Sequence, residues 1–163
     1  MFRILAAILA LGALAAAALI GTGTGASAQS PAGRTITLTE LEKGSTFKHV
    51  RNTRTKSSRA NSLGDVIVFT NPLADASGKV VGKLHANCAT TVGSSNFLKS
   101  RMTCSGVLVL RDGTLTVQTA FKVSASTVRG AVTGGTGAYA NARGTFVSTD
   151  DRGNSQDTIT LAG

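Results

Sequence analysis

Lys79 to Arg111 reads KVVGKLHANCATTVGSSNFLKSRMTCSGVLVLR, and this stretch decides the fold class. Hydrophobic residues alternate with polar ones on both sides of a turn at Gly93 to Asn96, as expected for two antiparallel strands that share one buried face. The residues on that face are Val80, Leu84, Ala86 and Cys88 before the turn and Met102, Cys104, Leu108 and Leu110 after it. The sequence therefore predicts a β-hairpin here.

The two cysteines fit the register of this hairpin. Pairing the strands about Asn96 places Cys88 opposite Cys104. Facing residues of a non-hydrogen-bonded antiparallel pair have Cα atoms about 4.5 Å apart, which is within the range of a disulfide. The bond would enclose fifteen residues, and a loop of that size is stabilised by roughly 3 kcal/mol in the chain-entropy model.

The rest of the chain from Gly33 onward shows short β-prone runs between turn residues and no helical periodicity. Asp112-Gly113 predicts a tight hairpin. Pro72 cannot donate to a strand ladder, so its strand should end or bulge there. Eight strands are expected: Thr35–Glu42, Gly64–Thr70, Lys79–Val92, Phe97–Arg111, Leu115–Val123, Thr127–Thr133, Gly144–Asp150 and Ser155–Leu161.

An antiparallel sheet of eight strands without covering helices must close or fold over to bury its apolar face. We predict an all-β fold, an eight-stranded antiparallel β-barrel with one disulfide, in residues 34–163, after a short linker at 29–33. Such a barrel is just wide enough to be filled by side chains or to hold one small ligand. A two-sheet sandwich is the alternative.

The first 28 residues have the pattern of a cleavable signal peptide. Arg3 precedes the apolar run Ile4 to Ile20, and a small-residue stretch ends in Ala26-Ser27-Ala28. A retained membrane anchor is disfavoured because the run is shorter than the roughly 20 residues of a spanning helix. We therefore expect a secreted, extracellular protein of 135 residues with no transmembrane anchor after cleavage.

The chain is strongly basic, with a formal charge of +9 that falls to +8 when Arg3 is removed. This charge favours anionic partners such as lipid headgroups or an envelope polymer. Lys48 to Arg59 holds five cations and no acid, and most of Lys43 to Leu63 should be a solvated loop. No nucleic acid partner is expected because only six aromatic residues follow the leader. Two cysteines and two histidines without paired spacing predict no metal site, and no cofactor is expected.

Three further stretches carry a family likeness. Asn61 to Asp65 reads NSLGD and is followed by Phe69 to Leu73, FTNPL; Val80-Val81-Gly82 comes next. Thr133 to Gly144 contains a Gly-Gly-Thr-Gly-x-(Phe/Tyr)-x-x-Ala-Arg-Gly signature. Its residues, which we interpret as structural, are Gly134, Gly135, Gly137, Tyr139, Arg143 and Gly144. In this order and spacing the chain resembles the allene oxide cyclase and dirigent family of barrels.

The resemblance implies an eight-stranded barrel with an apolar interior, assembled as a homotrimer in plants; the paired cysteines are more similar to secreted bacterial members. In the cyclases a buried asparagine holds a water near the substrate, and Asn71 matches it. A first-strand glutamate steers the cationic intermediate, and Glu40 matches it by position. The chain departs from both groups, because Cys88, which matches a cysteine of the cyclase pocket, is bonded to Cys104, and Thr70 stands in place of the dirigent carboxylate.

The candidate site residues each have a structural alternative. Asn71 shares an alternation face with Phe69 and should point inward, where a buried amide needs a partner; capping the turn before Pro72 is the favoured alternative. Glu40 is either a pocket carboxylate with a raised pKa or, as we favour, a solvated side chain at a barrel edge. We predict Phe69, Asn71 and Leu84 as the ligand pocket, with Asn71 and Glu40 as candidate catalytic groups.

Three functions follow from these features. The first is a secreted barrel that binds a small hydrophobic molecule without catalysis, because the interior has few candidate acids or bases. The second is an isomerase or cyclase of the allene oxide cyclase type, or a dirigent-like stereochemical guide. The third is an envelope-associated interaction protein that uses Lys48 to Arg59.

Overall fold

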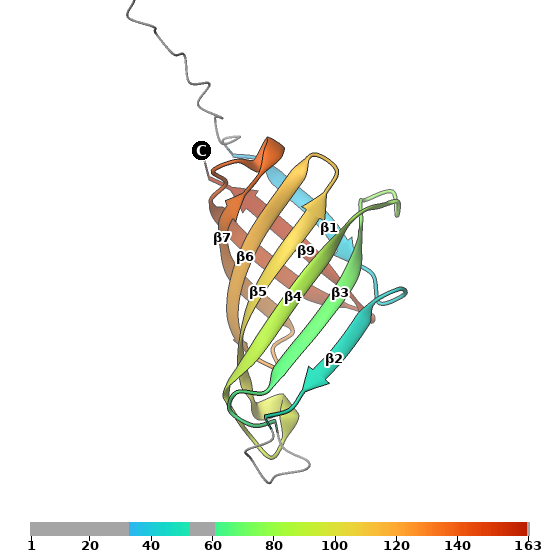
Figure 1. Ribbon diagram of the computed structural model, residues 1–163. Coiled ribbons are helices and arrows are strands. Elements are labelled where there is room, and N and C mark those ends of the chain that lie inside the picture. The colour runs from blue at the N-terminus through green and yellow to red at the C-terminus, as the bar shows by residue number, and fades with distance from the viewer. Residues whose placement is uncertain (1–32, 53–60, 163) are drawn as a thin grey trace, which may run out of the picture.

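The computed structural model describes residues 33–52 and 61–162, which form one twisted, closed β-sheet (Figure 1). Besides two single-turn 3₁₀ helices, the regular structure of these residues is all strand. The strands are β1 (Thr35–Glu40), β2 (Thr46–Val50), β3 (Val66–Ala74), β4 (Val80–Val92), β5 (Arg101–Leu110), β6 (Gly113–Lys122), β7 (Thr127–Gly135), β8 (Gly144–Asp151) and β9 (Asn154–Leu161). The helices are η1 (Phe97–Lys99) and η2 (Gly137–Tyr139).

The sheet is antiparallel throughout and closes on itself. Its order is β1-β9-β8-β7-β6-β5-β4-β3-β2, and β1 also pairs with β3. The closing pairs are Thr39 with Ala74 and Glu40 with Leu73. Eight strands thus form a closed antiparallel barrel, as the sequence predicts, and the sandwich alternative is wrong.

The segment expected to be a solvated loop contains a strand. β2 pairs through all five of its residues with Val66 to Thr70 of β3, and among the described strands it pairs with β3 alone. β1 pairs with the opposite end of β3, so β1 and β2 share one edge of that strand in succession. The expectation failed because β2 has no alternation of apolar residues and lies largely exposed. Residues 53–60 of the predicted basic loop lie outside the described residues.

Pro72 lies inside β3 rather than at its end. The strand continues to Ala74, and its ladder with β4 becomes irregular between Leu73 and Ala74. Pro72 needs no amide hydrogen here because it takes part through its carbonyl oxygen, which accepts the Leu41 N–H at 2.9 Å. The extra residue at this irregularity is Val81 of β4, which has no partner between Leu73 and Ala74, so the expectation that the strand of Pro72 ends or bulges at the proline is wrong.

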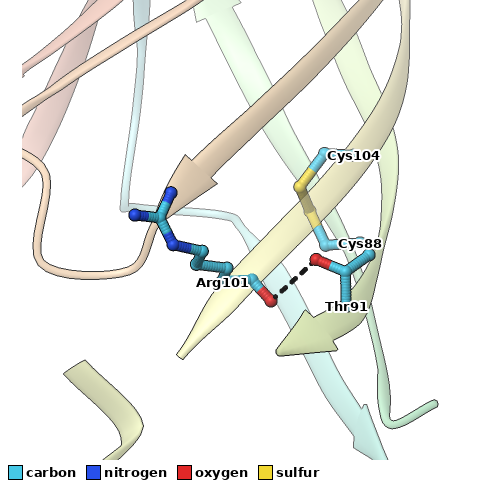
Figure 2. The surroundings of a disulfide bond; sticks show 4 residues. All are labelled: Cys88, Thr91, Arg101 and Cys104. Atoms are coloured by element: carbon cyan, nitrogen blue, oxygen red, sulfur yellow. Dashed lines mark hydrogen bonds between the residues drawn. A yellow bond between two sulfur atoms is a disulfide. The ribbon is translucent and has the colours of Figure 1, made fainter. Parts of the chain in front are cut away.

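The central hairpin has the predicted register. Cys88 lies opposite Cys104 in the β4–β5 ladder, and Leu84 lies opposite Leu108. The disulfide is formed, with Cα atoms 4.0 Å apart. Figure 2 shows it joining β4 to β5, with the Thr91 hydroxyl donating a hydrogen bond to the Arg101 carbonyl at 3.3 Å nearby. Val80 is the exception to the predicted face, since it is exposed where the hairpin begins.

Apolar side chains fill one end of the barrel. Leu73, Leu108, Leu115 and Ile159 have no accessible surface and belong to a cluster that reaches Tyr139 of η2. The cluster toward η1 is smaller and contains only Ile67, Cys88, Met102 and Cys104 as fully buried members. The η2 end is therefore packed, whereas the half toward η1 has room inside.

Glycines of the Gly-Gly-Thr-Gly signature turn the chain at the packed end. Gly137 has φ of +59°, which favours glycine. A Cβ atom at Gly135 would overlap the Tyr139 carbonyl oxygen. Tyr139 is buried, and Arg34 stacks over its ring with the guanidinium carbon 5.6 Å from the ring centroid. At this end Gly135 and Gly137 thus permit a close turn of the backbone around the buried Tyr139. No helix in the described ranges is long and apolar enough to span a bilayer.

Replacing both Cys88 and Cys104 by serine should lower the free energy of unfolding by about 3 kcal/mol, because the unfolded chain regains the entropy of a fifteen-residue loop. Urea denaturation with and without reductant measures the change. Reductant should destabilise the natural protein and leave the double variant unchanged. Equal midpoints for the two proteins without reductant would contradict this role of the disulfide.

Candidate functional site

A cavity of about 300 Å³ lies inside the barrel, in the half toward η1. Its wall is mainly apolar and includes Phe69, Leu84, Ala86, Val117, Phe121 and Phe146. A second hollow of about 310 Å³ shares Phe69, Asn71, Cys88, Phe121 and Val123 with it and extends to Phe47 and Phe97. Phe47 pairs with Phe69 but is 67% exposed, so the interior is open where β2 passes η1.

Glu40 is a buried member of the cavity wall. It lies at the end of β1, opposite Ser155 of β9 on one side and Leu73 of β3 on the other. Only 8% of its surface is exposed. The expectation of a solvated carboxylate is wrong because β1 is no edge strand at this point; both of its neighbours are in place.

Asn71 points into the same cavity and binds Glu40. Its side-chain amide donates a hydrogen bond to a Glu40 carboxylate oxygen at 2.5 Å. Asn71 pairs with Leu84 within the β3–β4 ladder, so it does not cap a turn before Pro72 as the favoured alternative held. Two residues 31 positions apart in the chain thus form one polar group in an apolar wall.

Asp157 is a further acid next to this group, and the sequence analysis did not select it. It lies on β9 between Leu38 and Ser148 of the neighbouring strands and has no accessible surface. Neither of its carboxyl oxygens makes a hydrogen bond of good geometry within the described residues. Burial, and then the negative charge of Glu40, raise the pKa of Asp157 to about 9, although the nearby Ser148 hydroxyl acts in the opposite direction.

The two acids therefore have different roles. Glu40 contacts the cavity, whereas Asp157 does not line it and lies behind the wall. At neutral pH Asp157 holds a proton, because ionising it would place a second negative charge in a site of low polarity. The pair can present one negative charge to the cavity and keep a proton close to it. Such a group can accept a hydrogen bond from a ligand hydroxyl or stabilise a positive charge.

The other predicted residues divide between the cavity and the surface. Phe69 and Leu84 line the cavity, and so do both cysteines, which form a disulfide and offer no free thiol. Arg143 is exposed and donates to the Ala142 carbonyl at 2.8 Å, so it does not face the interior. Within the described ranges no three metal-ligating side chains gather at one place.

A larger hollow of about 480 Å³ lies on the outer face of β2 to β5. His85 lies there, exposed on the outer side as its alternation predicts. The lining contains no carboxyl group. Its polar side chains, Thr46, Lys48, Thr70, His85, Asn87 and Ser105, lie on an outer face of the sheet where most of the lining is open to solvent. Because ligand sites usually enclose most of the ligand in a mainly apolar wall, the interior cavity is the stronger candidate.

Comparison with known proteins agrees with this architecture. The sequence profile of the family described as "Dirigent-like protein" matches residues 35–162. The chain belongs to the dirigent-like family. The allene oxide cyclase part of the resemblance stays a prediction. No curated protein matches the chain.

Several solved structures share the fold of this dirigent-like chain. A pyocyanin demethylase is 21% identical with a TM-score of 0.65, covering 79% of this chain and 100% of its own. The pterocarpan synthase dirigent protein PsPTS1 is 17% identical with a TM-score of 0.58, covering 79% and 92%. The exo-specific intermolecular Diels-Alderase AbnU is 16% identical with a TM-score of 0.53, covering 80% and 100%. At these identities the likeness concerns the fold.

The raised pKa of Asp157 makes stability depend on pH. Its proton is bound more tightly in the folded chain, so this group makes the free energy of unfolding fall as pH rises from about 4 to about 9. Asp157→Asn removes that dependence and should be more stable than the natural protein at pH 8, by about 1 kcal/mol or more, but not at pH 4.

Urea denaturation at pH 4, 6 and 8 measures this difference. Asp151→Asn is the matched control, since that side chain is 70% exposed and its removal should leave the pH profile unchanged. A constant difference between Asp157→Asn and the natural protein at all three pH values would show that Asp157 is not protonated in the fold.

Proposed function

We propose that this protein binds a small, mostly apolar molecule inside the barrel, with a hydroxyl group of the ligand on the Glu40 carboxylate. The observation that supports it is the interior cavity of about 300 Å³, whose apolar wall holds one buried carboxylate–amide pair. Ligand pockets are typically at least this large, mainly apolar, and fitted with a few polar groups that orient the ligand. The cavity suits a molecule of one or two fused rings.

The charge of the pair selects among such ligands. A hydroxyl can donate to Glu40, whereas the carboxylate of a fatty acid would bring a second negative charge into a poorly solvated site. Phenols and alcohols should therefore bind better than fatty acids. Solved barrels of this fold are named as a synthase, a demethylase and Diels-Alderases, which supports the view that the interior accepts organic molecules.

Titration with 2-naphthol, followed by its fluorescence, should show saturable binding that is weaker for the fluorescent fatty acid cis-parinaric acid. Ala86→Phe places a ring in the cavity and should raise the Kd for 2-naphthol at least roughly tenfold. Ala86→Leu adds a smaller side chain and should raise the Kd less. A graded increase over the two variants would distinguish filling of the cavity from misfolding. Ala89→Phe is the control on the same strand, because Ala89 is exposed. Equal affinity of all variants would sink interior binding.

A second candidate function is catalysis of a cyclisation or isomerisation of the bound molecule. The observation in its favour is the Glu40 carboxyl group, which is buried in the cavity wall. A carboxylate in such a site would stabilise a cationic transition state more strongly than in water. Asn71 fixes the orientation of that carboxylate through its hydrogen bond. The apolar wall would restrict which ring can close.

Adding the protein to an unstable allene oxide tests catalysis. If the barrel is a cyclase, chiral analysis should show an excess of one enantiomer of the cyclic product, and Glu40→Gln should return the mixture to a racemate because the stabilising charge is lost. Glu42→Gln, at an exposed position of the neighbouring turn, should keep the excess. A racemate with the natural protein would reject cyclase activity on this substrate and leave the binding experiment unaffected.

A further inference from the structure

The η1 end of the barrel exposes several large apolar side chains. Leu63 is 65% exposed, Leu98 55%, Val92 51% and Phe97 41%. They lie together, since a Cβ atom at Gly93 would be 3.0 Å from the Leu63 amide nitrogen and β4 ends beside η1 (Figure 1). A cluster of exposed large apolar residues on a monomer indicates an interaction surface.

Three exposed cations, Lys99, Arg101 and Lys122, border this cluster. Arg101 lies opposite Val92 in the β4–β5 ladder and opposite Lys122 in the β5–β6 ladder. The Ser124 amide donates to the Leu98 carbonyl at 3.2 Å, which joins η1 to the loop after β6. We call these seven residues, Leu63, Val92, Phe97, Leu98, Lys99, Arg101 and Lys122, the docking end.

The positive charge of the docking end is not balanced locally. None of its three cations forms an ion pair within the described part of the chain. Asp65 lies near but is 1% exposed and accepts the backbone N–H groups of Asn52 and Ser62. Asp150, whose amide donates to the Ser126 carbonyl, is exposed and lines the interior cavity, and it forms no ion pair with the three cations within the described residues.

We propose that the docking end binds the surface of an anionic lipid bilayer. Cations attract acidic headgroups, and each Lys or Arg near such a surface strengthens binding severalfold. Exposed leucine and phenylalanine side chains among them can enter the boundary between headgroups and acyl chains, as in interfacial proteins. A soluble polyanion would use the cations but gain nothing from Leu98 and Phe97, which is why the apolar residues favour a bilayer.

Docking at this end would also place the opening of the ligand cavity at the membrane, an inference that rests on the proposed function. Phe97 belongs to the docking end and also lines the open side of the interior hollow. A barrel docked in this way would have the mouth of its cavity next to the lipid, so a hydrophobic ligand could pass between membrane and barrel without crossing water.

The test is co-sedimentation with vesicles of phosphatidylcholine containing one third phosphatidylglycerol, and with vesicles of phosphatidylcholine alone. The protein is purified after export, and mass spectrometry establishes that the apolar run Ile4 to Ile20 is absent. The natural protein should bind the anionic vesicles and bind the neutral ones much more weakly. The combination Lys99→Gln with Lys122→Gln should weaken binding roughly 30-fold, and Leu98→Ser roughly tenfold.

Controls come from the other end of β4. The exposed fraction of Val80, 53%, is similar to the 55% of Leu98. Lys79 and Lys83 are exposed cations. Val80→Ser, and Lys79→Gln with Lys83→Gln, should change vesicle binding less than about twofold if docking is local. Equal losses in the control variants would mean that net charge alone drives binding, and would overturn the proposal.

Two other results would also overturn it. The first is no binding of the natural protein to anionic vesicles. The second is a combination of three observations: neutralising Lys99 and Lys122 abolishes binding, Leu98→Ser does not weaken it, and dextran sulfate competes fully with the vesicles. That combination would identify a soluble polyanion as the partner. Because no cavity ligand is added, failure here is distinguishable from failure of the 2-naphthol titration.

Discussion

Two residue pairs between β1 and β3, Thr39 with Ala74 and Glu40 with Leu73, close the sheet, and the interior exists because of them. Without closure β1 and the end of β3 that β2 does not cover would be edges, and their unpaired backbone groups would require solvent or another chain. Closure also removes Glu40 from water by placing a strand on each side of it. The same contact thus completes the barrel and creates its most unusual interior group.

The fold tolerates Glu40 and Asp157 in its interior because the two carboxyl groups are not both ionised. Burying two ionised carboxyl groups side by side would be strongly unfavourable. Here Asn71 donates to Glu40, and Asp157 keeps its proton, with a pKa raised to about 9. A purely structural core would be more stable with an apolar residue in place of Asp157. Retaining two acids beside a hollow is consistent with a site that acts on a ligand.

The sequence predicted the central hairpin correctly because two independent constraints agreed there: the apolar alternation and the cysteine pair both require Cys88 opposite Cys104. β2 was missed because its five residues carry no alternation, and it exists only through its ladder with β3. The burial of Glu40 depends on strands far away in the chain, which local patterns do not encode. Asp157 had a local signal, since it alternates with Ile159 and Leu161, but a charged residue on an apolar face was not recognised as a partner of Glu40.

The position of the disulfide follows from the unequal packing of the two ends. Toward η2 the core is continuous and leucines with no accessible surface hold the strands together. Toward η1 the interior is hollow, and a hollow forgoes the dispersion contacts that neighbouring side chains would supply. Cys88 and Cys104 lie in the wall of that hollow, where a covalent link between β4 and β5 replaces part of the missing packing. A barrel whose core was filled with apolar side chains at this level would depend less on the disulfide for its stability. The disulfide therefore offsets part of the stability that the cavity costs.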